Sequence, residues 1–502
     1  MGRYPVKATQ GAYQCGLEER MLFMFIDFIN KILQTGASSR MTDKQFVELE
    51  LNRWINSEKR KKMLDGEAYF EGRQSILHRQ RTVIGVDGSK EVVTNLPNNK
   101  LVDNQYGKMV RQKANYLLGK PLVFESENTD YEELLKGILT KDFMRKIKNG
   151  TVDGLNGGLF WLYVYVDDKG ELKFQRFPAY SVLPFWKDSE HTELDCAVRF
   201  YITEAYEGTI PTTIEHVEIF TSEGVKRYIR KNTMLIEDVD QPAESYLTDT
   251  DGNNYNWLKI PLIAFKFNDT EIPLIQRCKC LQDAYNEVYS DFMNNMQEDS
   301  RNSILILKNY DGEDLGTFRH NLAAYGVVKV KSVDGVEGGV DTLQIEVNAA
   351  NYEAILKALK KSIIENCMGY DAKDDRLGGN ANQMNIKSIY NDIDLEANDM
   401  ESEYQAAFEQ LLFFVNSYFQ ATDKGDFTKE KVTITFNRDM IMNESDVIDN
   451  LVKLGVKLSN ETLIGQVPFV DDVQKELDRI KSEDEANDNY GFVQQQPTNT
   501  GE

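Results

Sequence analysis

The longest hydrophobic pattern in the chain lies between residues 385 and 420 and is typical of one very long amphipathic helix. Apolar side chains recur there at alternating intervals of three and four residues, which places them along one helical face. At about 1.5 Å per residue such a helix would be roughly 54 Å long, which indicates a structural spine. The positions on this face are Ile386, Ile389, Ile393, Ala397, Met400, Tyr404, Phe408, Leu411, Val415 and Phe419.

Four shorter stretches also have helical periodicity. "TDKQ" at 42–45 has the form of a capping box and predicts a helix to about Met63, with Phe46, Leu49 and Trp54 facing inward. A second helix is predicted within 98–121 and should end at Gly119 and Pro121. A third, within 274–302, and a fourth, within 348–366, follow further along. The apolar stripe expected on the third is Cys278, Leu281, Tyr285, Val288, Phe292 and Met296.

The period of the pattern changes from helical to alternating between residues 155 and 267. "GLFWLYVYVDDKGELKFQRF" predicts two strands joined by a turn around Asp168 and Gly170. "DCAVRFYIT", "EHVEIFTSEGVKRYIR" and "PLIAFKFN" continue a mostly antiparallel sheet. Together with the flanking helices this predicts an α+β fold. The length of 502 residues allows about three domains.

The two ends of the chain differ from this body. Residues 1–40 are predicted to form an N-terminal arm. Its apolar run at 21–33 is shorter than the helix of about 20 residues that is needed to span a bilayer. We therefore predict no membrane interaction. Residues 440–482 are expected to form short helices, and the polar tail 483–502 is expected to be disordered.

The charge balance limits how the chain can meet nucleic acid. It has 58 basic and 81 acidic residues, a net charge of −23. Because lysine and arginine provide phosphate affinity, such a chain is a poor candidate for gripping DNA, although it could surround DNA. The run "KRKK" at 59–62 is interpreted as a solvated helix end rather than a nucleic-acid patch. Five scattered cysteines fit a reducing compartment.

No motif for catalysis, cofactor or metal stands out. The Gly-Lys pairs are followed by Met109 and Pro121, so neither continues as a Walker-type phosphate loop. "GLNGG" at 154–158 precedes a predicted strand, where no helix dipole would meet a dinucleotide. Cys278 and Cys280 point apart on a helix and are interpreted as one core and one exposed thiol. The acidic run at 392–403 could hold a metal, but a solvated or channel-facing helix surface is favoured.

The stretch "GYDAKDDRLGGNANQMN" at 369–385 separates two predicted helices. Its adjacent glycines could belong to a phosphate cradle, but three aspartates flank them and would repel phosphate. The residues favour a flexible connection between helices.

Three stretches and their order resemble portal proteins of tailed double-stranded DNA bacteriophages, most closely those of long-tailed phages of Gram-positive bacteria. "NNKLVDNQYGKMVRQKANYLLGKP" is similar to the helix that ends in Tyr-x-x-Gly-x-Pro in that family. "LQDAYNEVYSD" resembles its Asp-Ala-Tyr-Asn stretch. "LSNETLIGQVPFVDDVQKELDRIKSE" resembles its crown. The resemblance covers about residues 40–482.

The resemblance implies a division of the chain into regions. These are a wing at 41–273, a stem helix at 274–302, a clip at 303–347, a second stem helix at 348–366, a tunnel loop at 367–385, a long wing helix and strand at 386–439, and a crown at 440–482. Such subunits form a homo-oligomeric ring, typically a dodecamer, at one capsid vertex of the virion.

The resemblance also implies residues and partners. DNA would face the tunnel loop at Asp371, Lys373, Asp374, Asp375, Arg376, Gly378, Gly379, Asn380 and Asn382. The terminase large subunit and the head-completion (adaptor) protein would dock on the clip at Lys308, Asp311, Arg319, Lys329 and Lys331. Scaffolding and major capsid proteins are the other expected partners. The ring would assemble in the host cytoplasm.

Two other interpretations stay open at this point. A capsid or baseplate component would need no central channel and no loop between stem-like helices. An enzyme, such as a nuclease or a transferase, would need the carboxylates at 392–403 to converge on a metal, although they spread over several helix faces.

Overall fold

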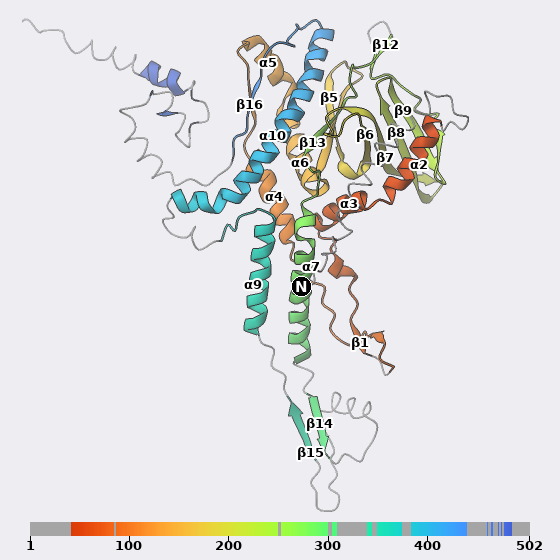
Figure 1. The fold of residues 1–502 in the computed structure, drawn as a ribbon, viewed down its shortest axis with the longest axis vertical. Helices are drawn as coiled ribbons and strands as arrows, with labels where there is room; N and C mark the ends of the chain where they lie inside the picture. Colours follow the sequence, from red (N-terminus) through yellow and green to blue (C-terminus); the bar gives the residue numbers. More distant parts are fainter. Residues whose placement is uncertain are drawn as a thin grey trace, which may run out of the picture. The chain divides into compact units, whose positions relative to one another are not determined.

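The computed structural model describes residues 42–84, 87–248, 253–299, 304–308, 339–343, 349–373 and 383–438, with short stretches between 459 and 483. The chain forms two compact units (Figure 1). The first takes its described residues from Met1–Lys61 and Ser181–Ile260, and the second from Lys62–Tyr180 and Pro261–Glu502. The 41–273 region therefore contributes to both units. The helices and strands together confirm the α+β class.

The first unit is built on a five-stranded antiparallel sheet. Its strands are β6 (Val182–Trp186), β7 (Leu194–Glu207), β8 (Ile210–Thr221), β9 (Gly224–Lys231) and β10 (Met234–Glu237), and each pairs with the next in sequence. β11 (Leu247–Thr248) and β12 (Asn254–Tyr255) form a separate small pair. The predicted antiparallel strands of this region are thus confirmed.

Helix α2 (Asp43–Ile55) packs on this sheet. Thr42 and Gln45 form the predicted capping box. Val47, Leu51 and Trp54 enter the core with side chains of β6–β10, whereas Leu49 is 43% exposed, so its predicted inward position is wrong. An apolar residue can stay in water when the helix face beside it already fills the core.

The expected single helix from residue 42 to about Met63 is also wrong. Helix α2 ends at Ile55 and α3 (Glu58–Phe70) begins after it, because Ser57 Oγ accepts a hydrogen bond from the backbone N–H of Arg60 at 3.2 Å. The run "KRKK" therefore lies in the first turns of α3 and not at the C-terminal end of a helix, where it was expected. Arg60 lies over the Trp54 ring, 5.0 Å from its centroid.

The second unit contains a three-stranded sheet covered by helices. β4 (Leu159–Val166) lies between β5 (Leu172–Pro178) and β13 (Leu262–Lys266), antiparallel to both. Helix α6 (Lys141–Gly157) leads directly into β4 through Gly158, which has φ +87° and would bring a Cβ to 2.1 Å from the Glu271 carbonyl oxygen. The glycine run therefore forms a tight turn between a helix and a strand, and the prediction that it precedes a strand is confirmed.

The other elements of this unit surround that sheet or extend from it. They are η1 (Ser75–His78), β1 (Thr82–Ile84), β2 (Lys90–Val92), α4 (Gln105–Leu118), β3 (Val123–Glu125), α5 (Thr129–Ile138) and η2 (Ala179–Ser181), which reaches into the first unit. β3 pairs with β16 (Thr433–Thr435). Gly119 caps α4 as predicted.

The predicted spine is helix α10 (Gln383–Ala421). All ten positions of its predicted apolar face are buried. Tyr404 and Phe408 pack edge-on against Phe265 of β13, with ring centroids 5.3 and 5.2 Å away. The spine therefore forms one side of the core of the second unit. None of the helices in the described parts of the chain is long and apolar enough to cross a membrane.

Candidate functional site

The second unit contains two neighbouring helices that run in opposite directions (Figure 1). α7 (Ile275–Asp299) and α9 (Ala349–Asn366) are antiparallel: Asn295 donates a hydrogen bond to the Tyr352 hydroxyl at 2.7 Å, and the thiols of Cys278 and Cys367 share one near the other end. Beyond the pair, β14 (Ile304–Lys308) and β15 (Gly339–Leu343) form an antiparallel ladder.

The buried face of α7 is polar. Four polar side chains spaced every four residues are fully buried: Gln282, Asn286, Ser290 and Asn294. They hold the backbone of the segment 99–106, hereafter the strap, which runs into the first turn of α4. The strap N–H groups of Asn99, Leu101, Asp103 and Tyr106 donate to Asn294, Ser290, Asn286 and Gln282 at 2.8, 3.0, 3.1 and 3.0 Å.

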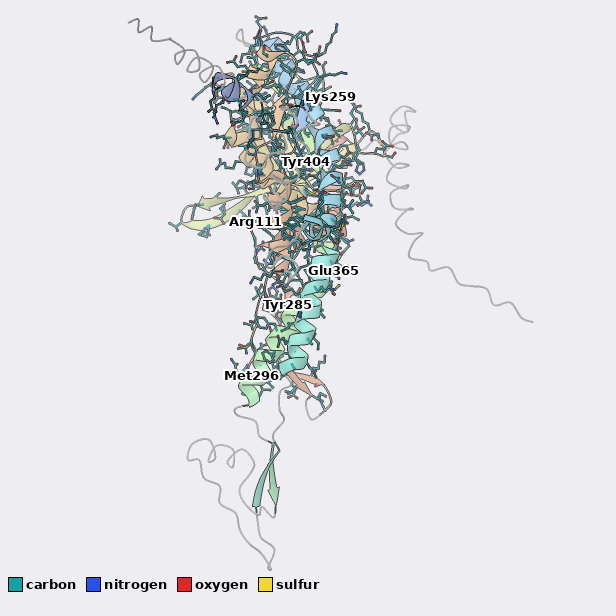
Figure 2. The ribbon with its side chains drawn as sticks, turned by 90° about the vertical axis from the view of Figure 1, so that its left-hand side faces the viewer. Arg111, Lys259, Tyr285, Met296, Glu365 and Tyr404 are labelled. Carbon is teal, nitrogen blue, oxygen red and sulfur yellow. The ribbon has the colours of Figure 1, made fainter. Side chains whose placement is uncertain are left out.

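The apolar stripe predicted on α7 is only partly inside its own subunit. Cys278 and Tyr285 are buried, but Leu281, Val288 and Phe292 are half-buried, and Met296 is 50% exposed. Figure 2 shows Met296 at the lower end of α7, below Tyr285. The prediction that this whole stripe faces the core is therefore wrong. The fully buried face of α7 is the neighbouring polar one, whose side chains bind the backbone N–H groups of the strap.

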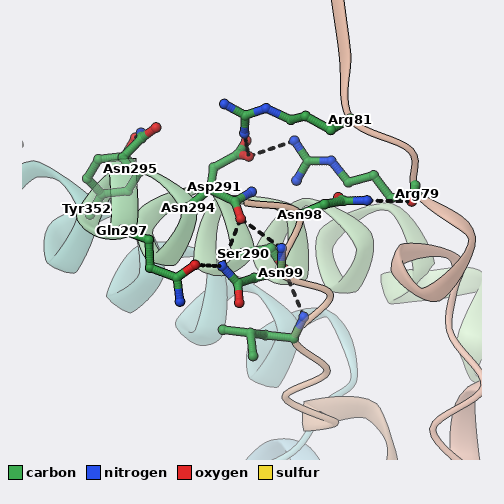
Figure 3. Close-up of polar contacts among 11 residues, drawn as sticks. Arg79, Arg81, Asn98, Asn99, Ser290, Asp291, Asn294, Asn295, Gln297 and Tyr352 are labelled. Carbon is green, nitrogen blue, oxygen red and sulfur yellow. Dashed lines mark hydrogen bonds and ion pairs between the residues drawn. The ribbon is translucent and has the colours of Figure 1, made fainter. Parts of the chain in front are cut away.

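The chain upstream of the strap is also fixed to α7, in a junction drawn in Figure 3. Asp291 accepts a hydrogen bond from Arg79 at 2.6 Å and lies 3.9 Å from Arg81. Asn98 donates to the Arg79 carbonyl at 3.3 Å. Together with the hydrogen bonds from Asn99 to α7, these contacts fix both ends of the segment 81–98 to the same stretch of α7.

A buried charge cluster joins α4, α7 and α10. The carboxylate of Glu396 pairs with Lys113 through one oxygen and with Arg277 through the other. Lys113 and Glu396 are almost inaccessible to solvent, with side chains 2% and 5% exposed. Burial lowers the pKa of Lys113, and the carboxylate of Glu396 opposes that shift. Removing either partner would leave an unpaired charge in the interior.

The same face of α4 holds the chain after α9. Lys113 Nζ donates to the Met368 carbonyl at 3.0 Å. The Gln112 side chain donates to the Tyr370 carbonyl at 2.9 Å and accepts from the Tyr370 N–H at 3.1 Å. Tyr370 also lies against Tyr390 of α10, with ring centroids 4.3 Å apart. These contacts, hereafter the α4 clamp, fix the base of the segment that continues past residue 373.

Gly369 makes this close approach possible. A Cβ on Gly369 would lie 2.5 Å from the Met109 sulfur and 2.9 Å from Gln112 Oε1. Its neighbour Met368 has φ +48°, in the left-handed region that ends helix α9. The turn between α9 and the clamp is therefore tightly specified.

The acidic run on α10 differs in part from its prediction. Glu396 is buried, and Asp394 and Glu401 pair with Arg438. Asp392 and Asp399 are exposed, as a solvated face requires. Within the described residues, no group of three or more histidine, cysteine or acidic side chains could hold a metal ion. The interpretation of Cys278 as a core thiol beside an exposed Cys280 is confirmed.

The structure reaches only part of the predicted site residues. Asp371 is half-buried and accepts from the Lys373 N–H at 3.1 Å, and Lys373 is exposed. Lys308 pairs with Gly339 in the β14–β15 ladder. The other predicted residues lie outside the described residues: Asp374, Asp375, Arg376, Gly378, Gly379, Asn380, Asn382, Asp311, Arg319, Lys329 and Lys331. So do the arm 1–40, the tail 484–502 and most of 440–482.

Sequence reasoning missed the strap and the clamp. A signal for the strap was available, since a small polar side chain recurs every fourth residue from Gln282 to Asn294. No local signal marks Gln112 or Lys113, because their partners lie more than 250 positions further along the chain.

Comparison with known proteins decides the family. The family model described as "Phage portal protein, SPP1 Gp6-like" matches residues 54–490. The chain belongs to this family. It is 30% identical over 432 residues to the portal protein of Bacillus phage SPP1, which covers 84% of this chain and 83% of that protein. It is 26% identical over 444 residues to the portal protein of Clostridium phage phiCD119, covering 86% and 94%.

Portal function is therefore assigned to the chain, and the predicted resemblance is confirmed. The family is structural rather than enzymatic, and its members are components of the phage capsid.

Proposed function

We propose that the chain forms a homo-oligomeric ring, a dodecamer, at one vertex of the capsid. The ring surrounds a channel through which double-stranded DNA enters during packaging and leaves during ejection. The family match supports the portal role. The observation that carries the proposed channel is the antiparallel α7–α9 pair, with the β14–β15 ladder beyond one end and the α4 clamp at the other.

In this proposal the α7–α9 pair is the stem and the chain between the two helices is the clip. The terminase large subunit, and later the head-completion (adaptor) protein, dock on the clip through Lys308, Asp311, Arg319, Lys329 and Lys331. Scaffolding and major capsid proteins meet the ring during assembly in the host cytoplasm. The motor must supply the energy, since the sequence contains no phosphate loop.

The segment 371–382 is the proposed constriction around DNA. Lys373 and Arg376 can contact phosphates, while Asp371, Asp374 and Asp375 keep those contacts weak. A strongly basic channel would hold DNA through counterion release, whereas a near-neutral one lets a polyanion slide. The α4 clamp supports this role, because a constriction needs a fixed base from which to project.

Native mass spectrometry of the purified chain, with negative-stain images, tests the ring. A closed ring of subunits around a central hole is expected; a monomer under all assembly conditions, scaffold included, would refute it. Deletion of 374–380, which spares the clamp, tests the constriction. Rings should still form, but heads built on these rings should fail to package or retain DNA. Normal packaging with the shortened segment would rule out the proposed constriction.

A further inference from the structure

The hairpin β1–β2 is exposed on all sides within its own subunit. Every residue of its two three-residue strands is exposed. Ile84 is 81% exposed and Val92 is 57% exposed. An isolated two-stranded hairpin is at best marginally stable in water, and apolar groups that stay in water gain nothing for folding. Such a hairpin requires a partner surface.

The register places the two most exposed apolar side chains, Ile84 and Val92, on one face, whereas Val83 lies on the other face with Glu91. Thr82 lies opposite Val92, and Ile84 lies opposite Lys90. Because side chains alternate along a strand, Thr82 and Ile84 share a face with their two cross-strand partners. Ile84 and Val92 are therefore neighbours on the same side of the hairpin.

The hairpin is nevertheless held in a fixed place. Both of its ends are fixed at the junction on α7. On one side Arg79 and Arg81 lie beside Asp291, and on the other Asn98 donates to the Arg79 carbonyl and Asn99 donates to Asn294 (Figure 3). The ladder also extends to the base, since the Val93 N–H donates to the Arg81 carbonyl at 3.0 Å. A hairpin anchored in this way presents its apolar face in a defined position rather than as a loose loop.

A complementary surface lies on helix α9. Four uncharged residues at positions i, i+3, i+4 and i+7 are all exposed: Asn351, Ala354, Ile355 and Ala358. Ile355 is 48% exposed, and the helix buries Ile363 and Ile364 instead. These four positions carry no charge, and the exposed lysines Lys357 and Lys361 flank them on the same helix. A second apolar face on a helix indicates a protein partner.

Helix α9 and the hairpin lie on opposite sides of α7, with the hairpin near the lower end of α7 (Figure 1). They therefore cannot cover one another within a subunit. A contact between two different patches of identical chains is heterologous, and repetition of such a contact closes into a ring when the rotation allows.

We propose that the hairpin β1–β2 of each subunit docks on the Ile355 stripe of α9 in the next copy of the chain. This inference rests on the proposed ring. It assigns the contact that joins neighbouring subunits beside the stem, with Ile84 and Val92 packing between Ala354, Ile355 and Ala358. Each copy supplies one hairpin and one stripe, so every subunit of the ring is linked on both sides.

Paired cysteines test the contact in the assembled full-length chain. Cys15→Ser, Cys196→Ser and Cys280→Ser leave only the two buried cysteines, Cys278 and Cys367, in the background. On that chain, Ile84→Cys with Ile355→Cys and a short bismaleimide should give a ladder of covalent multimers on a denaturing gel. Either cysteine alone should give none, because identical patches do not meet. The matched control pairs Val239→Cys, a 90% exposed position, with Ile355→Cys and should also give none.

Native mass spectrometry of the same sample separates the possible failures. Rings without a ladder would overturn the hairpin contact and leave the proposed function intact. Dimers from Ile84→Cys alone would also overturn it, since they indicate a symmetric contact. Absence of rings from the unmodified chain would overturn the ring and this inference together. As a second variant, Ile84→Asp should dissociate rings at least tenfold more readily on dilution than Ile210→Asp, an exposed position outside the hairpin.

Discussion

At the scale of single residues, Lys113 connects two parts of the second unit. It pairs with Glu396 of α10 inside the protein and donates to the Met368 carbonyl as part of the α4 clamp. Its lowered pKa reflects the cost of burying the ammonium group. Lys113 therefore links the spine helix to the base of the segment 371–382, and its loss should affect both.

We expect Lys113→Met to destabilise the clamp locally by about 3 kcal/mol, the lower end for breaking a buried pair, because Glu396 keeps Arg277. Hydrogen exchange in peptides covering 105–118 and 367–373 should become about a hundredfold faster, since each 1.4 kcal/mol is about a factor of ten. Lys108→Met is the control, because Lys108 is exposed on the same helix. Equal exchange in both variants would contradict a structural role for the pair.

At the scale of elements, the strap on α7 depends on a match between two periodicities. Four helical residues rise by about 6.0 Å, and two residues of extended chain advance by about 6.6 Å. Three successive side chains on this face, those of Asn286, Ser290 and Asn294, therefore accept from three alternate N–H groups of the strap. These are the N–H groups of Asp103, Leu101 and Asn99, in that order. The helix side chains act as the partner strand that the strap lacks.

We expect Asn286→Leu to loosen the strap. The substitution leaves the partly buried Asp103 N–H without its acceptor, at a cost of about 1–3 kcal/mol. Limited proteolysis should then cut within 98–104 about tenfold faster. Glu287→Leu, at the next position and exposed, should leave the cutting rate unchanged. Equal rates for Asn286→Leu and the unmodified chain would mean that the strap is held by other contacts.

The elements differ in how far the sequence predicts them. All ten apolar positions predicted on α10 are buried, because they serve one core and the period is unbroken, although the prediction did not include Tyr390, Ala407 and Phe414, which are buried as well. The α7 face was predicted wrongly at Met296, because periodicity identifies an amphipathic face but not which partner covers it. The break between α2 and α3 depends on one hydroxyl of Ser57, a cap that hydrophobic spacing does not register.

At the scale of the whole molecule, charge is the property that suits a channel. The chain carries a net charge of −23, and the sequence 371–376 contains three aspartates and two cationic residues. In a ring, the balance in this segment is repeated in every subunit. Small changes per chain therefore sum to large changes in the potential that DNA meets.

We expect the triple variant Asp371→Asn, Asp374→Asn and Asp375→Asn to slow DNA movement through the ring. Only Lys373 and Arg376 would then carry charge in 371–376, and each further phosphate that these cations neutralise releases more counterions from the DNA. Packaging should slow at low salt and recover as salt rises, because the added attraction is electrostatic. The measurement is the packaging rate of assembled heads across a salt series. The control variant Asp168→Asn, Asp269→Asn and Asp423→Asn changes the net charge equally at exposed positions elsewhere. If both variants slow packaging alike, the effect comes from overall charge and the segment 371–382 does not contact DNA. If only the first variant slows packaging, with a steeper salt dependence, the three aspartates keep the proposed constriction from binding DNA tightly.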